Sequence, residues 1–154
     1  MRFRRGCRGF WLVPLAFGLD RLTKVLANRS GEVRTLIPGV LRCRPVRNSG
    51  MAFSLFSGQT WLLIGATSAV LLGLAVYLLL RPEEHPLTRA GFWLVIGGGL
   101  GNLFDRLAYG SVIDFLELTF VRFAIFNVAD IFVCIGAGLA LLGMFLSERK
   151  GRKR

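Results

Sequence analysis

Two aspartates are candidates for a chemical role at membrane depth. They are Asp114 in the segment GSVIDF and Asp130 in the segment FNVAD. An ionised carboxyl at membrane depth is costly, so it is a candidate functional group. Two carboxyls close enough to share a proton do not both ionise readily, which lets one act as a base and the other as an acid. Such a pair could activate water and protonate a leaving amine, the two tasks of amide hydrolysis.

The composition indicates that this pair works in a membrane. Of the 154 residues, 53% are hydrophobic, and the mean hydropathy of +0.55 is far above that of an ordinary soluble domain. No charged residue lies between Arg47 and Arg81, and Asp130 alone interrupts the stretch from Phe123 to Ser147. Runs of this length match the roughly 20 residues that a helix needs to cross about 30 Å of hydrocarbon.

We therefore predict an all-α membrane protein with four transmembrane helices and a small extracytoplasmic β-hairpin or sheet at the outer interface. A chain of this length is expected to form a single domain over residues 1–154. The predicted spans are residues 10–27, 60–80, 90–107 and 126–146.

Two segments are predicted to lie at the outer interface. Residues 32–58 form the expected hairpin, because two short β-favouring runs flank a turn signal at Pro38 and Gly39. Residues 109–125 are β-branched and aromatic but too polar to span, which favours an extended or half-inserted segment. Irregular backbone at that depth needs protein or a water-filled cavity beside it, so we expect Asp114 to line such a cavity.

The net charge of +11 is concentrated at the two ends of the chain. Basic patches can bind nucleic-acid phosphates, but a chain this apolar leaves no soluble domain to present a groove, so we expect no nucleic-acid partner. By the positive-inside bias, basic clusters at both ends predict that both termini are cytoplasmic, which requires an even number of spans. The clusters are Arg2, Arg4, Arg5 and Arg8 at the start, and Arg149, Lys150, Arg152, Lys153 and Arg154 at the end.

Four arginines of the predicted hairpin lie on the outer face and run against this bias. They either bind phosphate head groups of lipids or belong to a solvated basic loop, and the sequence leaves both possibilities open. They are Arg34, Arg42, Arg44 and Arg47.

Polar residues follow a glycine-rich stretch of the predicted third span. Asn102, Asp105 and Arg106 fall at i, i+3 and i+4, on one helical face. Asp105 and Arg106 could simply be interfacial charges that reach water. Asn102 lies deeper and its amide needs partners, which favours a polar cluster inside the helix bundle. The glycines, Gly97, Gly98, Gly99 and Gly101, are expected to serve close helix packing.

The fourth predicted span opens with a capping signal. Asn127 is a favoured N-cap and Asp130 falls at N3, near the positive end of the helix dipole. Capping alone explains these two residues but leaves Asp114 without a reason. The catalytic hypothesis accounts for both aspartates, because one helical turn carries Asp130 only about 5 Å from the helix start.

We expect neither a metal nor a cofactor. The three cysteines, Cys7, Cys43 and Cys134, are scattered on segments that should not meet, and they show no metal-ligand spacing. His85 is the only histidine and lies in a predicted polar loop, so a zinc site would lack its usual ligands.

Four motifs, in order, resemble those of the lipoprotein signal peptidases, also called signal peptidase II. They are DRLTK at residues 20–24, NSGMAFS at 48–54, GGGLGNLFDRLAYGSVIDF at 97–115 and FNVAD at 126–130. The resemblance covers nearly the whole chain. Each motif alone is weak evidence of the resemblance. All four in this order, on a chain with four predicted spans, are specific evidence of it.

The resemblance implies an aspartic endopeptidase of the bacterial inner membrane. Its substrate would be a prolipoprotein whose lipobox cysteine carries diacylglyceryl, and we expect a monomer surrounded by membrane lipids. The catalytic pair would be Asp114 and Asp130, toward the extracytoplasmic face. The family's supporting or substrate-binding positions fall on Asp20, Lys24, Asn48, Asn102, Arg106 and Asn127. Met51 and the basic stretch from Arg42 to Arg47 depart from the family pattern without touching the pair.

Three alternatives remain open from the sequence. Lys24 with Ser54 or Ser111 could form a serine–lysine peptidase, although Lys24 also suits an i, i+4 ion pair with Asp20. A proton-coupled small transporter or channel would use the same carboxyls in the membrane. A purely structural membrane subunit would need no chemistry from them.

Overall fold

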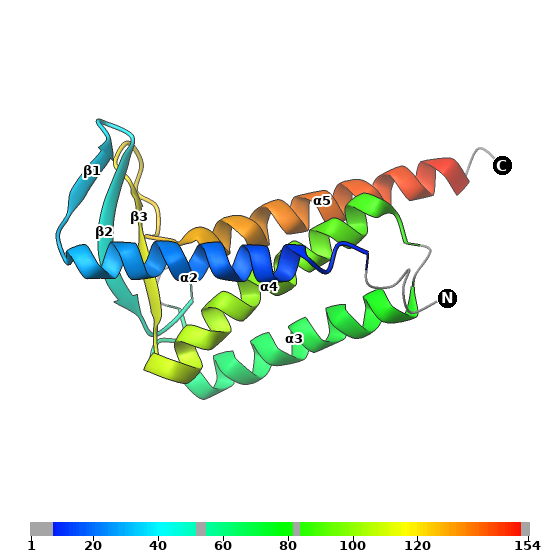
Figure 1. Cartoon of the computed structure of the whole chain (residues 1–154), viewed down its shortest axis with the longest axis horizontal. Helices are drawn as coiled ribbons and strands as arrows, with labels where there is room; N and C mark the ends of the chain where they lie inside the picture. The colour runs from blue at the N-terminus through cyan, green and yellow to red at the C-terminus, as the bar shows by residue number, and fades with distance from the viewer. Residues whose placement is uncertain (1–7, 52–54, 82–83, 152–154) are drawn as a thin grey trace.

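The computed structural model describes residues 8–51, 55–81 and 84–151, and shows a helical bundle with a small sheet across one end (Figure 1). In chain order the elements are α2 (Leu12–Ser30), β1 (Arg34–Ile37), β2 (Leu41–Asn48), α3 (Thr60–Leu80), α4 (Pro86–Tyr109), β3 (Val112–Leu118) and α5 (Val128–Gly151). The prediction of a mainly helical protein with a small sheet is confirmed.

Several residues named above lie outside the described part of the chain. They are Arg2, Arg4, Arg5, Cys7, Ser54, Arg152, Lys153 and Arg154, together with the side chain of Lys150.

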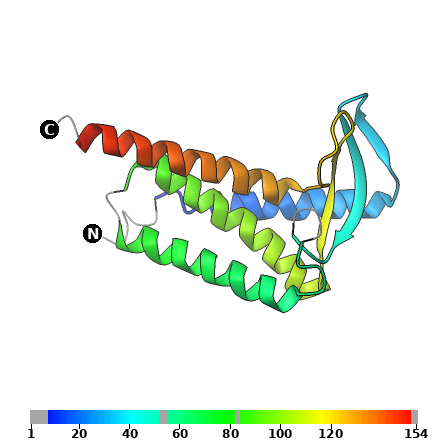
Figure 2. The same ribbon diagram turned by 180° about the vertical axis from the view of Figure 1, so that it is seen from behind.

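Helix α4 is the centre of the bundle, because it packs against α2, α3 and α5. Figure 2 shows it between α3 and α5, with α2 on the far side. A Cβ on Gly97 would collide with the Cβ of Ala16 and would lie tightly against the backbone of Val13 in α2, and a Cβ on Gly98 would collide with the carbonyl of Ala129 in α5. The predicted packing role of the glycine-rich stretch is therefore confirmed.

Two helices in the described part of the chain are long and apolar enough to cross a membrane: Thr60–Leu80, which is α3, and Val128–Arg149 of α5. Helices α2 and α4 have 19 and 24 residues, but charged side chains interrupt both. At 1.5 Å per residue they are about 28 Å and about 36 Å long, comparable with a hydrocarbon core of about 30 Å.

Helix α4 begins at Pro86 rather than near residue 90, where the third span was predicted to start. Pro86 occupies the first helical turn, where its fixed φ and missing N–H suit the helix. His85, predicted to lie in a polar loop, is the N-cap, and its side chain accepts a hydrogen bond from Leu87 N–H at 3.3 Å. The charged residues around Pro86 made this segment look like a polar loop in the sequence, so the predicted start came later than the helix start in the structure.

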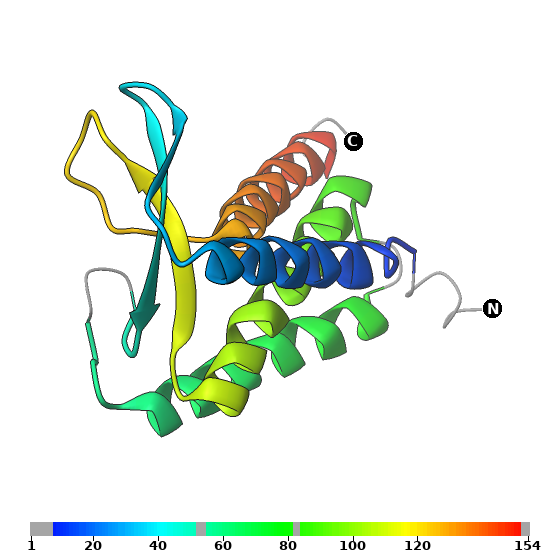
Figure 3. The same cartoon turned by 60° about the vertical axis from the view of Figure 1, so that its left-hand side comes forward.

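The sheet is antiparallel with the order β1–β2–β3, and it stands across the bundle end where α5 begins (Figure 3). Strands β1 and β2 form the predicted hairpin. Gly39 has a φ of 72° in its turn, and Val40 N–H donates to Ile37 O at 3.1 Å. The strands are shorter than the predicted 32–58 range, because residues 49–51 and 55–58 form bends and turns. The extended segment predicted within residues 109–125 is β3, which pairs with β2.

Candidate active site

Asp114 lies in the middle of β3, opposite Val46 of the central strand β2. It is only 3% exposed. Its Oδ1 accepts a hydrogen bond from Asn127 Nδ2 at 2.6 Å, and its Oδ2 accepts one from Asn48 Nδ2 at 3.0 Å. Each oxygen of this buried carboxyl therefore has an amide donor, which fixes its orientation.

Asp130 lies in the first turn of α5 and forms the predicted capping box with Asn127. Asp130 N–H donates to Asn127 Oδ1 at 3.0 Å, and Asn127 N–H donates to Asp130 Oδ2 at 3.1 Å. This exchange satisfies two backbone donors at the helix start. It leaves Oδ1 of Asp130 available for another donor, so capping does not compete with a second role.

The amide of Asn102, on α4, connects the two aspartates. Its Nδ2 donates to Asp130 Oδ1 at 2.8 Å, and its Oδ1 accepts from Asn127 Nδ2 at 3.0 Å. The same nitrogen of Asn127 also donates to Asp114. A continuous chain of hydrogen bonds therefore runs from Asp114 through Asn127 and Asn102 to Asp130, and it joins a strand to two helices.

Burial raises the pKa of the Asp114 carboxyl above its ordinary value, and the negative charge of Asp130 raises it further. The hydrogen bonds from Asn48 and Asn127 lower this pKa, because they stabilise the charged form. Burial is the largest of these effects, so Asp114 keeps its proton to a higher pH than an aspartate in water.

Four charged side chains of α2 and α4 form a buried cluster beside these amides. Lys24 Nζ lies 3.0 Å from Asp20 Oδ2, 2.8 Å from Asp105 Oδ2 and 2.9 Å from Asn102 Oδ1. Arg21 contacts Asp105 at 2.5 Å and Asp20 at 2.7 Å. Lys24 is 1% exposed and both aspartates are fully buried, whereas the Arg21 side chain is 20% exposed. Two cations therefore neutralise two buried anions, and only Arg21 reaches the edge of the cluster.

This cluster also fixes the backbone of the two elements that carry the site aspartates. Asp20 Oδ1 accepts from Ala129 N–H at 3.0 Å, and Asp105 Oδ2 accepts from Ile113 N–H at 3.2 Å. Each of these N–H groups belongs to the residue directly before one of the two site aspartates. The cluster therefore sets where β3 and α5 place their carboxyls.

Arg106 extends from α4 to the loop that follows β2. Its Nη2 donates to Gly50 O at 2.8 Å. Asn48 fixes the same loop, because its Oδ1 accepts from Gly50 N–H at 2.9 Å and its Nδ2 donates to Met51 O at 3.2 Å. The negative charges of Asp114 and Asp130 attract the positive guanidinium group of Arg106. Its Nε is buried and has no hydrogen-bond partner within the described residues.

All eight residues predicted for the site thus lie in one network. Arg21 was not predicted as a site residue, and the alternative of an interfacial charge is wrong for Asp105, which is fully buried. The i, i+3 spacing from Asn102 to Asp105, together with the pair Arg21 and Lys24 on α2, was the available signal.

The contacts of Lys24 do not suit a serine–lysine peptidase. An ammonium group has three hydrogens, and Nζ has three acceptors within hydrogen-bond distance. Such a lysine is a buried cation rather than a free base. Over the described residues, no group of three His, Cys, Asp or Glu side chains could hold a metal ion.

Comparison with known proteins gives a consistent result. Residues 12–146 match the family described as signal peptidase (SPase) II. The lipoprotein signal peptidase of Gloeobacter violaceus is 43% identical over 145 residues, covering 92% of this chain and 84% of that protein. The one from Brevibacillus brevis is 35% identical, covering 93% and 98%. A bacterial membrane enzyme solved by the in meso method at 2.3 Å has a TM-score of 0.83 at 26% identity, covering 92% of this chain and 89% of that one.

Proposed function

The chain belongs to the signal peptidase II family, bacterial membrane aspartic peptidases that act on lipoprotein precursors, and we propose that Asp114 and Asp130 are its catalytic pair. The observation that carries this proposal is the hydrogen-bond chain from Asp114 through Asn127 and Asn102 to Asp130. It holds two carboxyls from different elements at one place, as general acid–base catalysis requires.

In the proposed reaction, the ionised carboxyl of the pair removes a proton from a water molecule, and the water oxygen attacks the scissile carbonyl. The protonated carboxyl donates its hydrogen to the leaving nitrogen as the carbon–nitrogen bond breaks. The products are a carboxylic acid and an amine, so no other reactant is needed. The raised pKa of Asp114 helps the pair to retain one proton to a higher pH than an aspartate in water would.

The supporting side chains divide into two roles. Asn102 and Asn127 direct their amide hydrogens at the aspartates, so they orient the pair. Arg106 has a buried Nε without a partner in the described part of the chain, which makes it the candidate donor to the oxyanion that forms during attack.

For the membrane arrangement, we propose that all four helices span the inner membrane, with both termini in the cytoplasm and the sheet at the extracytoplasmic face. The lengths of α2 and α4 support this. Most of their charged side chains are buried or half-buried in the bundle, and Arg29, which is exposed, lies in the last turn of α2. We further propose that the enzyme works as a monomer among membrane lipids and binds no nucleic acid.

The proposed substrate is a prolipoprotein with a diacylglyceryl-modified lipobox cysteine, from which the enzyme removes the signal peptide. Cleavage of a synthetic lipobox peptide by the purified chain in detergent tests this proposal. Mass spectrometry should find two peptide products, one of which keeps the acylated cysteine, and an unmodified peptide should be cleaved much more slowly. Absence of a peptide product, together with pH-dependent flux in sealed vesicles, would identify the transporter alternative instead.

A further inference from the structure

One end of the sheet carries an exposed surface that is both apolar and basic. The β1–β2 turn and the loop after β3 lie side by side there, because Leu41 pairs with Leu118 and Thr119 N–H donates to Val40 O at 3.0 Å. We call residues 32–44 and 117–123 the sheet-tip surface. Its exposed hydrophobic side chains include Leu36, Ile37, Val40, Phe120, Val121 and Phe123.

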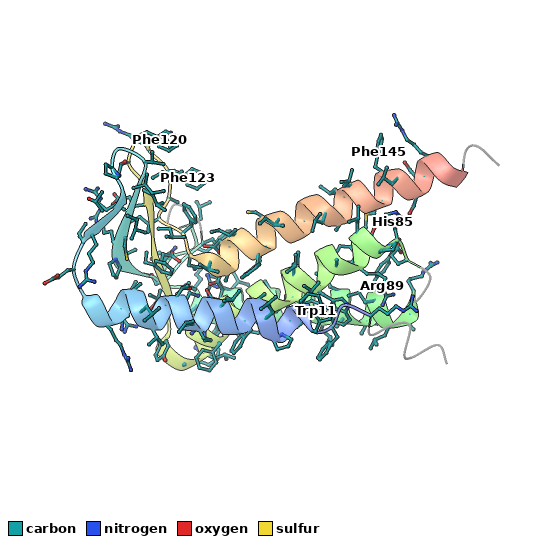
Figure 4. The ribbon with its side chains drawn as sticks, turned by 45° about the horizontal axis from the view of Figure 1, so that its top comes forward. Trp11, His85, Arg89, Phe120, Phe123 and Phe145 are labelled. Atoms are coloured by element: carbon teal, nitrogen blue, oxygen red, sulfur yellow. The ribbon has the colours of Figure 1, made fainter. Side chains whose placement is uncertain are left out.

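The position of this surface suits contact with a membrane. The sheet-tip surface projects sideways past the start of α5, at one end of the helix bundle (Figure 1). Figure 4 shows Phe120 and Phe123 beside the sheet, on the side that faces along the helix bundle. Phe120 is 67% exposed and Phe123 is 54% exposed. Aromatic side chains on that side would meet the interface of the bilayer that surrounds the bundle.

The charge of the surface is positive. Its four arginines, Arg34, Arg42, Arg44 and Arg122, outnumber its two glutamates, Glu32 and Glu117, and leave two positive charges. Both Arg42, through Nε at 2.9 Å, and Arg44, at 3.2 Å, contact the single carboxylate of Glu117. This carboxylate holds the two arginines in place but neutralises only one of them.

A cavity of about 650 Å³ opens within this surface. Arg42 and Arg122 line it, together with Glu117 and the aromatic rings of Phe120 and Phe123. Because Arg42 contacts Glu117 through Nε, its two Nη groups are available for a bidentate contact with a phosphate. The cavity therefore combines phosphate donors with apolar side chains, as a phospholipid requires at the depth where its head group meets its acyl chains.

We propose that the sheet-tip surface binds anionic phospholipids, with the lipid phosphate at Arg42 and Arg122 and the rings of Phe120 and Phe123 inserted beside the glycerol. The net positive charge selects anionic over zwitterionic head groups. The ring of Phe120, which is 67% exposed, favours a lipid over a soluble anion, because a soluble anion would leave this ring in water. This inference goes beyond the peptidase activity and does not depend on the aspartate pair.

Native mass spectrometry of the full chain in micelles containing equal amounts of phosphatidylglycerol and phosphatidylcholine tests the proposal. The wild type should retain phosphatidylglycerol preferentially. The double variant Arg42→Gln/Arg122→Gln should lose affinity by roughly five-fold for each arginine. Arg149→Gln is the matched control, because Arg149 lies over Phe145 at the opposite end of the bundle. Equal retention of both lipids by the wild type, or an equal loss in the control, would overturn the proposal.

A second variant guards against misfolding, since Arg42 also joins β2 to β3 through Glu117. Phe120→Ser/Arg122→Gln changes only exposed side chains and should lose the same preference. Cleavage kinetics distinguish a lipid from the substrate peptide. If the Arg42→Gln/Arg122→Gln variant raises KM for the acylated peptide equally in phosphatidylcholine and phosphatidylglycerol bilayers, the surface binds the peptide and the lipid proposal fails.

Discussion

Asn127 and Asp130 exchange two hydrogen bonds across the first turn of α5, one from each backbone N–H to the side chain of the other. The side-chain nitrogen of Asn127 faces away from this exchange and donates to Asp114 at 2.6 Å. One asparagine therefore caps a helix and orients a carboxyl on a neighbouring strand. The capping box, usually a stabilising device alone, here sets the relative position of two acidic groups.

Replacing Asn127 with serine separates these two roles. Serine is a good N-cap, so the thermal stability of Asn127→Ser in detergent should stay close to that of the wild type. The variant loses the amide that contacts Asp114, and kcat should fall by roughly a hundred-fold. Asn127→Ala should lose both the cap, worth about 1 kcal/mol, and the activity. Full activity in Asn127→Ser would show that Asn127 has only a capping role.

Lys24 is expected to be a structural cation. Lys24→Met leaves Asp20 and Asp105 with only Arg21 to compensate two buried negative charges. Breaking a buried ion pair by removing one partner costs about 3–5 kcal/mol, so the unfolding temperature in detergent should fall strongly. A variant that keeps its unfolding temperature but loses all cleavage would instead point to Lys24 as a catalytic base.

Gly101 permits the approach of α2 to α4 at the buried charge cluster. A Cβ added there would collide with the Asp20 carboxylate and contact the Cβ of Ala129, whose N–H Asp20 binds. Gly101→Ala should cost about 1–3 kcal/mol through overpacking and should reduce kcat, because it displaces the start of α5. Gly138→Ala in α5 is the matched control, since nothing lies within 4 Å of its added Cβ. Equal stability of both variants would contradict this close packing.

The sequence predicted those site residues whose interactions join positions only three or four residues apart. Asn127 and Asp130 form a capping signal three residues apart, and the ion pair of Asp20 with Lys24 follows from i, i+4 spacing. The pairing of β2 with β3 is different, because it joins segments more than sixty residues apart across two intervening helices. No local pattern specifies the register that places Asp114 opposite Val46.

The environment of Arg21 and Asp105 could not be predicted from the sequence either. A charged residue near a predicted helix end is explained equally well by contact with water or by a partner on another helix. Only the arrangement of α2 against α4 decides between these, and it buries Asp105 fully against Arg21 and Lys24. Arg42 and Glu117 are likewise partners across two strands that the sequence does not pair.

The pH dependence of stability should report the protonation of Asp114. Its raised pKa means that the folded state binds this proton more tightly than the unfolded state does. Between the unfolded pKa, about 3.9, and the raised folded pKa, the folded chain carries more protons, so this contribution to stability falls as pH rises. Thermal unfolding across this range should show the stability of wild type minus that of Asp114→Asn decreasing with pH. A difference that grows with pH would mean that the folded state lowers this pKa.

The most direct test of the aspartate pair compares Asp114→Asn and Asp130→Asn with Glu117→Gln in cleavage of a diacylglyceryl lipobox peptide. Glu117 is the matched control, because it is a carboxylate on the same strand as Asp114 but pairs with Arg42 and Arg44 outside the site. Each asparagine variant should fold normally and lose at least about a thousand-fold in kcat/KM, while Glu117→Gln cleaves close to the wild-type rate. Substantial cleavage by either asparagine variant would contradict the catalytic pair.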